Sequence, residues 1–211
     1  NSISLLTQDI SEMQKFGELT DEGISRTTDG ISQQLGFMVQ TIDDFRDFFK
    51  PDKEKCYFSI VNAIQSVLKI FAIQIKVYDI VVTLQSNASD DRVYGFENEF
   101  KQVILNILNN AKDIFLETKR MDNCVSIELS NQGECIVISM SDNAGGIDAS
   151  LLPDKIFESY VSTKGSHGTG IGLSMGKMII EKRFGGTIRA FNNDEGAEFE
   201  IILPMQKGSL E

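Results

Sequence analysis

The second half of the chain contains three short motifs in a fixed order: Asn106-Ile-Leu-Asn109-Asn110-Ala, then Asp142-Asn-Ala-Gly145-Gly146-Ile, then Gly168-Thr-Gly170-Ile-Gly172-Leu. Each motif alone is weak evidence, because asparagines on helices and glycines in loops are common. Their joint order and spacing would seldom arise by chance. Together they predict an ATP site carried by an α+β fold.

The apolar pattern around these motifs alternates between helix and strand. One helix is predicted after Ser59, which can cap it, and two more cover about 98–118 and 171–184. β-Branched or alternating apolar residues predict strands of a sheet that is covered on one face: Ile80–Leu84, Val125–Leu129, Ile136–Met140, Thr187–Phe191 and Ala197–Leu203. Helices on one face of a mixed sheet make an α/β sandwich, and the strand order stays open.

Residues 1–54 are predicted to form a helical hairpin. Thr20 or Asp21 can cap its second helix, and Pro51 ends that helix. Two helices with one apolar stripe each cannot bury both stripes, so a homodimer through a four-helix bundle is expected. The alternative is that the hairpin packs on its own C-terminal domain. The stripes follow a heptad pattern: Ile3, Leu6, Ile10 and Met13, then Ile31, Leu35, Met38, Ile42, Phe45 and Phe49.

Composition and charge exclude several function classes. A net charge of -11 over 211 residues argues against binding to a phosphate backbone, so no nucleic-acid partner is expected. Cys56, Cys124 and Cys135 match no CxxC spacing, which favours a reducing compartment and thiols that are buried or half-buried. No apolar run reaches the roughly 18 residues of a spanning helix, so no membrane contact by this chain is expected.

In its three motifs the chain resembles the C-terminal kinase core of sensor histidine kinases. The motifs are similar to that family's N box, G1 box and G2 box, and Phe157-Glu-Ser-Tyr160 is similar to its F box. The resemblance is strong from about Phe96 to Pro204 and rests on pattern alone in the hairpin. It implies a Bergerat-type ATP-binding domain over 55–207, with ATP and Mg²⁺ as cofactors. Residues 208–211 are expected to be a tail or cloning-derived residues.

The asparagine motif places two amides on one helix face, because Asn106 and Asn110 are four residues apart. Asn109 and Asp113 flank that face. Mg²⁺ prefers hard oxygen ligands and keeps waters and phosphates in its shell, so one amide oxygen can be its single protein ligand. The resemblance implies that Asn110 is this metal ligand and that Asn106 lies at the phosphates. A solvated polar helix face is the alternative.

Asp142 follows an apolar strand and precedes two glycines, where the backbone can turn sharply and approach a ligand. The resemblance implies that its carboxylate accepts a hydrogen bond from the adenine amino group, with Gly146 and Ile147 beside it. An ordinary Asp-Asn turn at a strand end is the alternative.

Two positions near the expected adenine site depart from the family pattern. Ala144 changes the usual spacing of the glycines after Asp142. Ala197 stands where the family usually has a threonine, which removes one hydroxyl near the adenine and weakens binding by about 1 kcal/mol.

The stretch Gly165–Gly172 is rich in glycine and leads into a helix, where free backbone amides suit a polyphosphate. It is not a P-loop, because Gly172 is followed by leucine and not by Lys-Ser/Thr, and it lacks the preceding strand of a dinucleotide fingerprint. Residues 153–169 are predicted to form a lid that closes over the nucleotide. The nucleotide-binding residues expected here are Phe157, Thr163, Lys164, His167, Gly168, Thr169, Gly170, Ile171, Gly172 and Leu173.

His167 is the only histidine, and a phosphate loop is a poor place for in-line attack, so it is not expected to be a phosphoacceptor. The resemblance implies an acceptor upstream of residue 1, so this chain alone should bind ATP but not phosphorylate itself. ATP-hydrolysing relatives have a glutamate as general base where this chain has Asn106, and losing such a base costs about 10²- to 10⁴-fold.

The amide at position 106 therefore favours a histidine kinase over an ATPase. The resemblance implies transfer of the γ-phosphoryl group to a histidine and its relay to an aspartate of a response-regulator receiver domain. The alternative is a nucleotide-binding interaction module that signals by lid closure without phosphotransfer. A cytoplasmic location is expected, in a parent protein that can be anchored in the bacterial inner membrane.

Overall fold

The computed structural model describes residues 15, 20, 24–25, 27–29, 31–32, 54–118, 120–161 and 170–205. The chain divides into two compact units, Asn1–Phe49 and Lys50–Glu211. In the first unit the described residues from Ile24 to Ser32 are helical, and the Ile24 N–H donates to the Thr20 carbonyl at 2.9 Å. Both residues lie in or next to the segment where the second helix of the hairpin is predicted. Apart from the half-buried Ile31, the predicted heptad residues lie outside the described residues.

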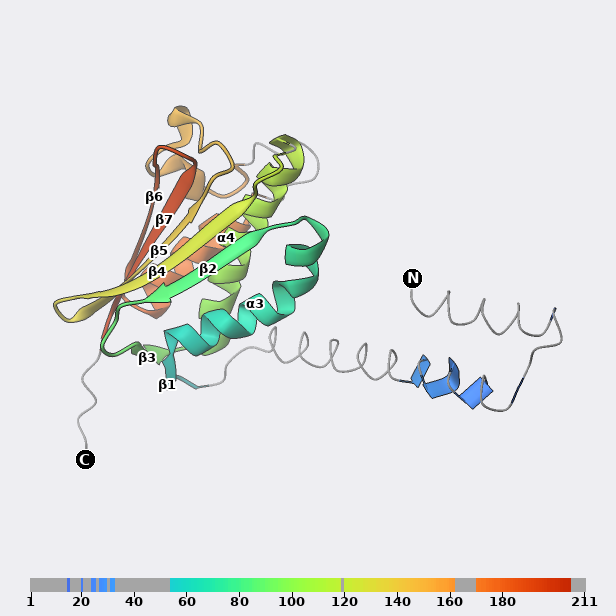
Figure 1. Cartoon of the computed structure of the whole chain (residues 1–211). Coiled ribbons are helices and arrows are strands. Elements are labelled where there is room, and N and C mark those ends of the chain that lie inside the picture. The colour runs from blue at the N-terminus through green and yellow to red at the C-terminus, as the bar shows by residue number, and fades with distance from the viewer. Residues whose placement is uncertain are drawn as a thin grey trace. The chain divides into compact units, whose positions relative to one another are not determined.

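The second unit contains the helices and strands of the predicted α/β sandwich (Figure 1), which confirms the α+β class. Its strands are β1 (Cys56–Ser59), β2 (Val81–Ser86), β3 (Arg92–Gly95), β4 (Cys124–Gln132), β5 (Cys135–Asp142), β6 (Thr187–Asn192) and β7 (Ala197–Pro204). Its helices are α3 (Ile60–Val77), α4 (Glu97–Thr118) and α5 (Gly172–Met178), with 3-10 turns η1 (Ala149–Leu151) and η2 (Lys155–Phe157) and a π-helical segment η4 (Ile179–Arg183) that continues α5.

The main sheet has five strands in the order β2-β4-β5-β7-β6. Only the β2–β4 pair is parallel, and the other three pairs are antiparallel. β1 and β3 form a separate antiparallel pair, which the sequence analysis did not predict because each strand has only four residues. This order places β5 in the centre of the sheet, so its last residue, Asp142, lies between β4 and β7.

One face of the sheet is apolar and buried, as the alternating pattern predicts. The opposite face carries polar pairs, such as the Ser139 hydroxyl donating to Glu198 at 2.6 Å and an Arg189–Glu200 ion pair at 3.8 Å. The buried residues of the sheet and of α4 form one core: Val125, Ile127, Leu129, Ile136, Ile138, Met140, Ile188, Ala190, Phe199, Ile201 and Leu203 from strands, with Phe100, Val103, Ile104, Ile107, Leu108, Ala111 and Phe115 from α4. All six α4 residues expected inside are therefore buried, and Phe115 joins them.

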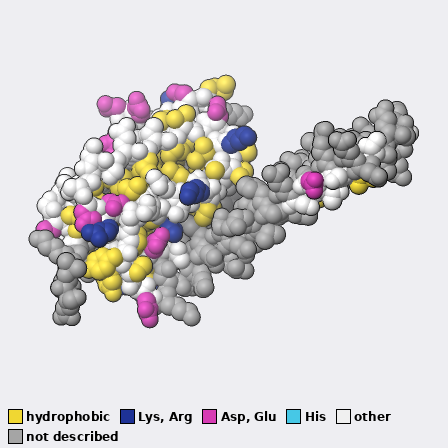
Figure 2. Space-filling view, turned by 60° about the horizontal axis from the view of Figure 1, so that its bottom comes forward, with side chains coloured by type: hydrophobic (Ala, Val, Ile, Leu, Met, Phe, Trp, Pro, Cys, Tyr) yellow, Lys and Arg dark blue, Asp and Glu magenta, His cyan; other side chains and the backbone are white. Residues whose placement is uncertain are grey.

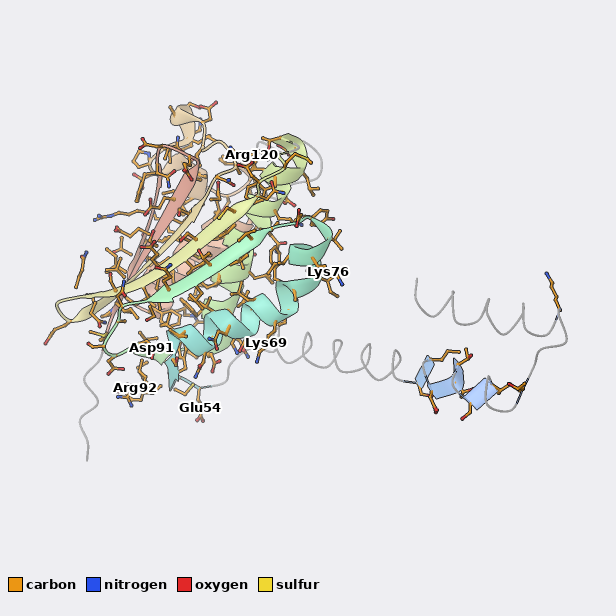
Figure 3. All side chains as sticks on the ribbon, viewed as in Figure 1. Glu54, Lys69, Lys76, Asp91, Arg92 and Arg120 are labelled. Carbon is orange, nitrogen blue, oxygen red and sulfur yellow. The ribbon has the colours of Figure 1, made fainter. Side chains whose placement is uncertain are left out.

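α3 begins at Ser59, whose hydroxyl accepts a hydrogen bond from the Asn62 N–H at 3.1 Å, as the cap prediction requires. Among the described residues it alone is long and apolar enough to cross a membrane, with a mean hydropathy of 1.5 over 18 residues. This corrects the expectation that no stretch passes that test. The inner face of α3 belongs to the protein core, whereas Lys69 and Lys76 project outward (Figure 3).

The outer side of α3 also leaves apolar side chains in solvent, with Ile73 54% and Val77 65% exposed. Figure 2 brings this side of the domain forward and shows hydrophobic side chains among charged ones. The three cysteines form no disulfide. Cys124 and Cys135 are half-buried as predicted, but Cys56, the first residue of β1, is exposed.

Candidate functional site

A cavity of about 330 Å³ opens between α4, the end of β5, the turns after it and the start of α5. This volume lies in the range of small-molecule sites. Its lining combines a few polar groups with many apolar ones: Asn106, Asn109, Asn110, Ala111, Asp113, Ile114, Asp142, Ala144, Gly146, Ile147, Asp148, Leu151, Ile156, Val161, Gly170, Gly172, Leu173, Ala197 and Phe199. Described residues from each of the three motifs thus line one cavity. Asn106 and Gly172 are in contact although they are 66 positions apart in the sequence.

The carboxylate of Asp142 is held in a fixed orientation by the backbone. Its Oδ1 accepts hydrogen bonds from the Ala144 N–H at 2.9 Å and from the Ala197 N–H at 3.3 Å. Burial raises the pKa of Asp142, and these two hydrogen bonds oppose that rise. Because Oδ1 is occupied, Oδ2 is the oxygen that can accept a hydrogen bond from a ligand.

The backbone around Asp142 explains two glycines and one alanine of the motifs. Gly145 and Gly146 have φ of +103° and +85°, which favour glycine. A Cβ on Gly196 would collide with the carbonyl of Asp142 and lie 2.7 Å from its Oδ1. Ala144 has no left-handed φ, and its side chain is buried in the cavity wall. Its methyl group is therefore accommodated without strain, and Asp142 and Gly146 keep their expected places.

The opposite wall is a polar face of α4, where Asn106, Asn109, Asn110 and Asp113 are all half-buried. The Asn106 Nδ2 donates to the carbonyl of Gly172 at 3.1 Å, which joins α4 to the first residue of α5. Asp113 pairs with Lys112 at 3.0 Å. No group of three or more His, Cys, Asp or Glu side chains suited to a metal occurs among the described residues. A cation on this face would therefore need phosphate or water oxygens beside the amide oxygens.

At the rim of the cavity, the predicted lid segment contacts the residue that directly follows it. The Tyr160 N–H donates to the Gly170 carbonyl at 3.0 Å. Gly170 has φ of +62°, and a Cβ there would lie 2.7 Å from the carbonyl carbon of Tyr160, so only glycine fits. Phe157 lies beneath the rim, 6% exposed, with its ring edge-on to Phe199 at 6.5 Å.

Lys177 of α5 connects to the same rim segment. Its ammonium group lies 3.3 Å from the Asp154 carboxylate and 5.1 Å from the centre of the Phe157 ring. Such cation–π contacts contribute about 0.5–1 kcal/mol at exposed sites. The start of the predicted lid is therefore attached to α5 at two points.

The structure brings together most of the expected site residues that it describes. Those lining the cavity are Asn106, Asn110, Asp113, Asp142, Gly146, Ile147, Gly170, Gly172, Leu173 and Ala197. Phe157 and Ile171 do not line it: Phe157 packs below the rim, and Ile171 is an exposed N-cap of α5. Thr163, Lys164, His167, Gly168 and Thr169 lie outside the described residues.

Sequence reasoning missed the apolar part of the lining, above all Ile114, Leu151, Ile156 and Val161. For Ile156 and Val161, the available signal was the presence of apolar residues within the predicted lid. It also missed Asn192 at the end of β6, whose amide exchanges two hydrogen bonds with Ile147. An asparagine near a turn gives no local indication of such a contact 45 positions away.

Residues 95–207, more than half of the chain, match the model of the histidine kinase-, DNA gyrase B- and HSP90-like ATPase family. The chain belongs to this family. Its members named among the relatives are sensor kinases, which agrees with the resemblance noted in the sequence. The family assignment, the Bergerat-type fold and the motif geometry therefore agree.

Two curated relatives and one solved structure illustrate the similarity. The two-component sensor PprA of Pseudomonas aeruginosa is 35% identical over 117 residues, 54% of this chain and 12% of the relative. Sensor protein TdiS of Thauera aromatica is 27% identical over 185 residues, 83% of this chain and 33% of the relative. The nucleotide-free catalytic domain of the histidine kinase ThkA matches with a TM-score of 0.64 and 27% identity, covering 73% of this chain and 99% of that chain. The chain thus spans a third or less of these two curated relatives.

Proposed function

We propose that this chain is the ATP-binding core of a sensor histidine kinase, which binds ATP with Mg²⁺ and transfers the γ-phosphoryl group to a histidine. The observation that carries the proposal is the Asp142 carboxylate, fixed by two backbone N–H groups in a cavity whose other wall is the asparagine face of α4. An acceptor oxygen aimed into a cavity suits the exocyclic amine of adenine, whereas guanine presents a carbonyl oxygen at that position and would be repelled.

The helix wall supports the assignment of the phosphates and the metal. Its amide oxygens are the hard donors that Mg²⁺ accepts, and the lack of a carboxylate cluster among the described residues suits a metal that arrives with the nucleotide. Asn110 is our candidate ligand, and Asn106 and Asp113 lie one helical turn to either side of it. When bound, the Mg²⁺ would neutralise charge on the phosphates.

Asn106 also separates kinase from hydrolase chemistry. An amide cannot take a proton, and its Nδ2 already donates to Gly172, so it cannot activate water as a general base. Phosphoryl transfer depends mainly on positioning and charge neutralisation, which this site offers without a base. This favours transfer to a nucleophile from elsewhere over hydrolysis.

The partners follow from the same assignment. We propose a homodimer through the residues 1–54 hairpin and relay to the aspartate of a response-regulator receiver domain. The histidine kinase ThkA has been crystallised with a response regulator, and 98% of this chain aligns with that kinase at 23% identity, a likeness that shows the fold alone. The acceptor histidine upstream of residue 1 and the cytoplasmic location belong to the same proposal.

Calorimetric titration with ATP and Mg²⁺ tests the adenine site. We expect saturable binding, which Asp142→Ala weakens by about 10²-fold because a hydrogen bond to a charged group is lost. The matched control is Asp122→Ala, which removes an exposed carboxylate that pairs with Arg120 at 2.9 Å outside the cavity. Equal binding by all three proteins, or no binding by the wild type, would contradict the proposal.

Transfer is tested on the parent protein with γ-labelled ATP. A phosphohistidine is acid-labile and stable in base, so both stabilities should be measured on the labelled product. Label that appears in the parent and is lost with Asn110→Ala supports the kinase. Tight ATP binding without any label would instead support a module that signals by closure of the lid.

A further inference from the structure

We infer that Asn192 is a positioning residue for the adenine pocket, holding the turn Gly145–Ile147 in place from the edge strand of the sheet. This inference rests on the proposed nucleotide site and adds to it a residue that does not line the cavity. It starts from one contact between β6 and the turn after β5.

The side-chain amide of Asn192 makes the two hydrogen bonds that a paired backbone residue would make with Ile147. Its Oδ1 accepts from the Ile147 N–H at 2.7 Å, and its Nδ2 donates to the Ile147 carbonyl at 2.8 Å. Two residues that exchange both hydrogen bonds form the repeating unit of an antiparallel ladder. Since one partner is an N–H and the other a carbonyl, the amide has only one orientation that satisfies both. Ile147 is therefore attached to the end of β6 through both of its backbone polar groups.

This clamp, defined as the two hydrogen bonds between Asn192 and Ile147, accounts for the glycine next to Ile147. A Cβ on Gly146 would lie 2.9 Å from the Asn192 Oδ1 and 3.1 Å from its Cγ. Gly146 also has φ of +85°, which a side chain would disfavour. The clamp and the glycine thus depend on each other, and both lie next to the cavity wall.

The clamp fixes the far end of the turn that begins at Asp142. The near end is fixed because Asp142 is the last residue of β5, pairs with Val125 of β4 and bonds Ala144 and Ala197 through Oδ1. Without the clamp, Gly146 and Ile147 would keep their chain connection but lose their attachment to the sheet.

The neighbouring Asn193 orders the other side of the same corner. Its Oδ1 accepts from the N–H groups of Glu195 and Gly196 at 2.9 and 2.8 Å, and this shapes the β6–β7 turn. Gly196 then lies against Asp142. Consecutive asparagines at the end of β6 therefore hold both segments that enclose the base side of the cavity.

The test compares Asn192→Ala with Asn131→Ala in calorimetric titrations with ATP and Mg²⁺. Asn131 makes the same kind of clamp outside the cavity, since its Oδ1 accepts from the Ser89 N–H at 2.7 Å and its Nδ2 donates to the Asp90 carbonyl at 3.0 Å. We expect Asn192→Ala to weaken ATP binding about tenfold, as loss of two neutral hydrogen bonds implies, and Asn131→Ala to change it less than about twofold.

Hydrogen exchange supplies a readout that a general loss of stability would not move. The Ile147 amide should lose protection in Asn192→Ala and keep it in Asn131→Ala, whereas Asn192→Asp should retain the acceptor for this amide. If Asn192→Ala does not fold, Asn192→Asp carries the affinity test, because it keeps the acceptor for the Ile147 N–H and replaces the bond to the Ile147 carbonyl with repulsion between two oxygens. We expect it to bind ATP several-fold more weakly than the wild type.

Two results overturn the inference: unchanged ATP affinity in a folded Asn192 variant, or equal weakening by Asn131→Ala. A wild-type chain without saturable ATP binding contradicts the proposed function itself. The wild-type titration therefore separates failure of the site from failure of the clamp.

Discussion

The two walls of the cavity are built differently. On the sheet side, hydrogen bonds from backbone N–H groups and from Asn192 fix Asp142 and the turn that follows it. On the α4 side, half-buried amide side chains project from one helix, and Asn106 is joined to α5 by a single bond to Gly172. The rigid wall suits recognition of a planar base, which needs fixed directions, and the side-chain wall suits phosphates and a metal that bring their own charge.

Replacing Asp142 by asparagine tests the rigid wall most severely. The two backbone N–H groups require an oxygen at Oδ1, so the new Nδ2 takes the place of Oδ2 and faces the adenine amine, donor against donor. We expect ATP affinity to fall about 10²-fold. Inosine triphosphate, which has an acceptor oxygen at that position, should bind the variant better than ATP does. Calorimetry with both nucleotides measures this inversion.

The control for this substitution is wild-type protein with inosine triphosphate. This nucleotide should bind weakly, because its carbonyl oxygen would face the Asp142 Oδ2 and both are acceptors. If Asp142→Asn weakens the binding of both nucleotides equally, the carboxylate acts through its charge and not through the direction of its hydrogen bond. The contrast between the two walls would then be wrong on the sheet side.

Gly196→Ala should disturb the rigid wall without touching any side-chain donor. Its Cβ would collide with the carbonyl of Asp142, so the start of β7 must shift. We expect a loss of about 1–3 kcal/mol in the free energy of unfolding and weaker ATP binding. Gly176→Ala is the control, because its Cβ would lie 3.6 Å from Val103, an ordinary van der Waals contact between α5 and α4. Chemical denaturation and ATP titration should both leave the control near wild type.

Asn110→Ala tests the side-chain wall, where we expect dependence on the metal. ATP affinity should fall about tenfold with Mg²⁺ present and change little with EDTA, because one ligand oxygen is lost. The control is Gln102→Ala, a half-buried polar residue of α4 outside the cavity. An equal loss in EDTA would remove Asn110 as the ligand.

Ala197→Thr offers a smaller, opposite effect on the sheet side. The Ala197 N–H already bonds Asp142, and its side chain lines the cavity, so a hydroxyl there can reach an adenine nitrogen or a water. We expect ATP affinity to rise by a few-fold, within the gain of about 1 kcal/mol from one neutral hydrogen bond. Ala197→Val, of similar size but without the hydroxyl, separates the hydrogen bond from the added volume.

The sequence predicted what depends on neighbours along the chain. The apolar face of α4, the cap at Ser59 and the place of Asp142 at a strand end all follow from local periodicity and chemistry. The strand order could not be predicted in this way, because it depends on pairing between segments far apart in sequence. For the same reason the Asn192 contact was missed. Cys56 was predicted to be buried or half-buried, but it is the exposed first residue of a four-residue strand, and no local sequence signal shows that this strand end is exposed.

The smallest effect that we predict is the pH dependence of stability in the absence of ligand, which depends on the burial of Asp142 in the sheet-side wall. Burial raises the pKa of Asp142 in the folded chain, so the ionised carboxylate destabilises the fold above that pKa. This loss of stability disappears as pH falls toward about 3.9, the ordinary pKa of an aspartate in the unfolded chain. Asp142→Asn should therefore melt at a higher temperature than wild type at neutral pH, and the difference should shrink in acid. Asp148→Asn is the control of opposite sign, because hydrogen bonds from Ser150 lower the pKa of Asp148 and its stabilisation is lost as pH falls. Thermal unfolding from pH 8 down to about pH 2, below the ordinary pKa of an aspartate, should show the two differences moving in opposite directions. Parallel curves would mean that the site's carboxylate is not desolvated.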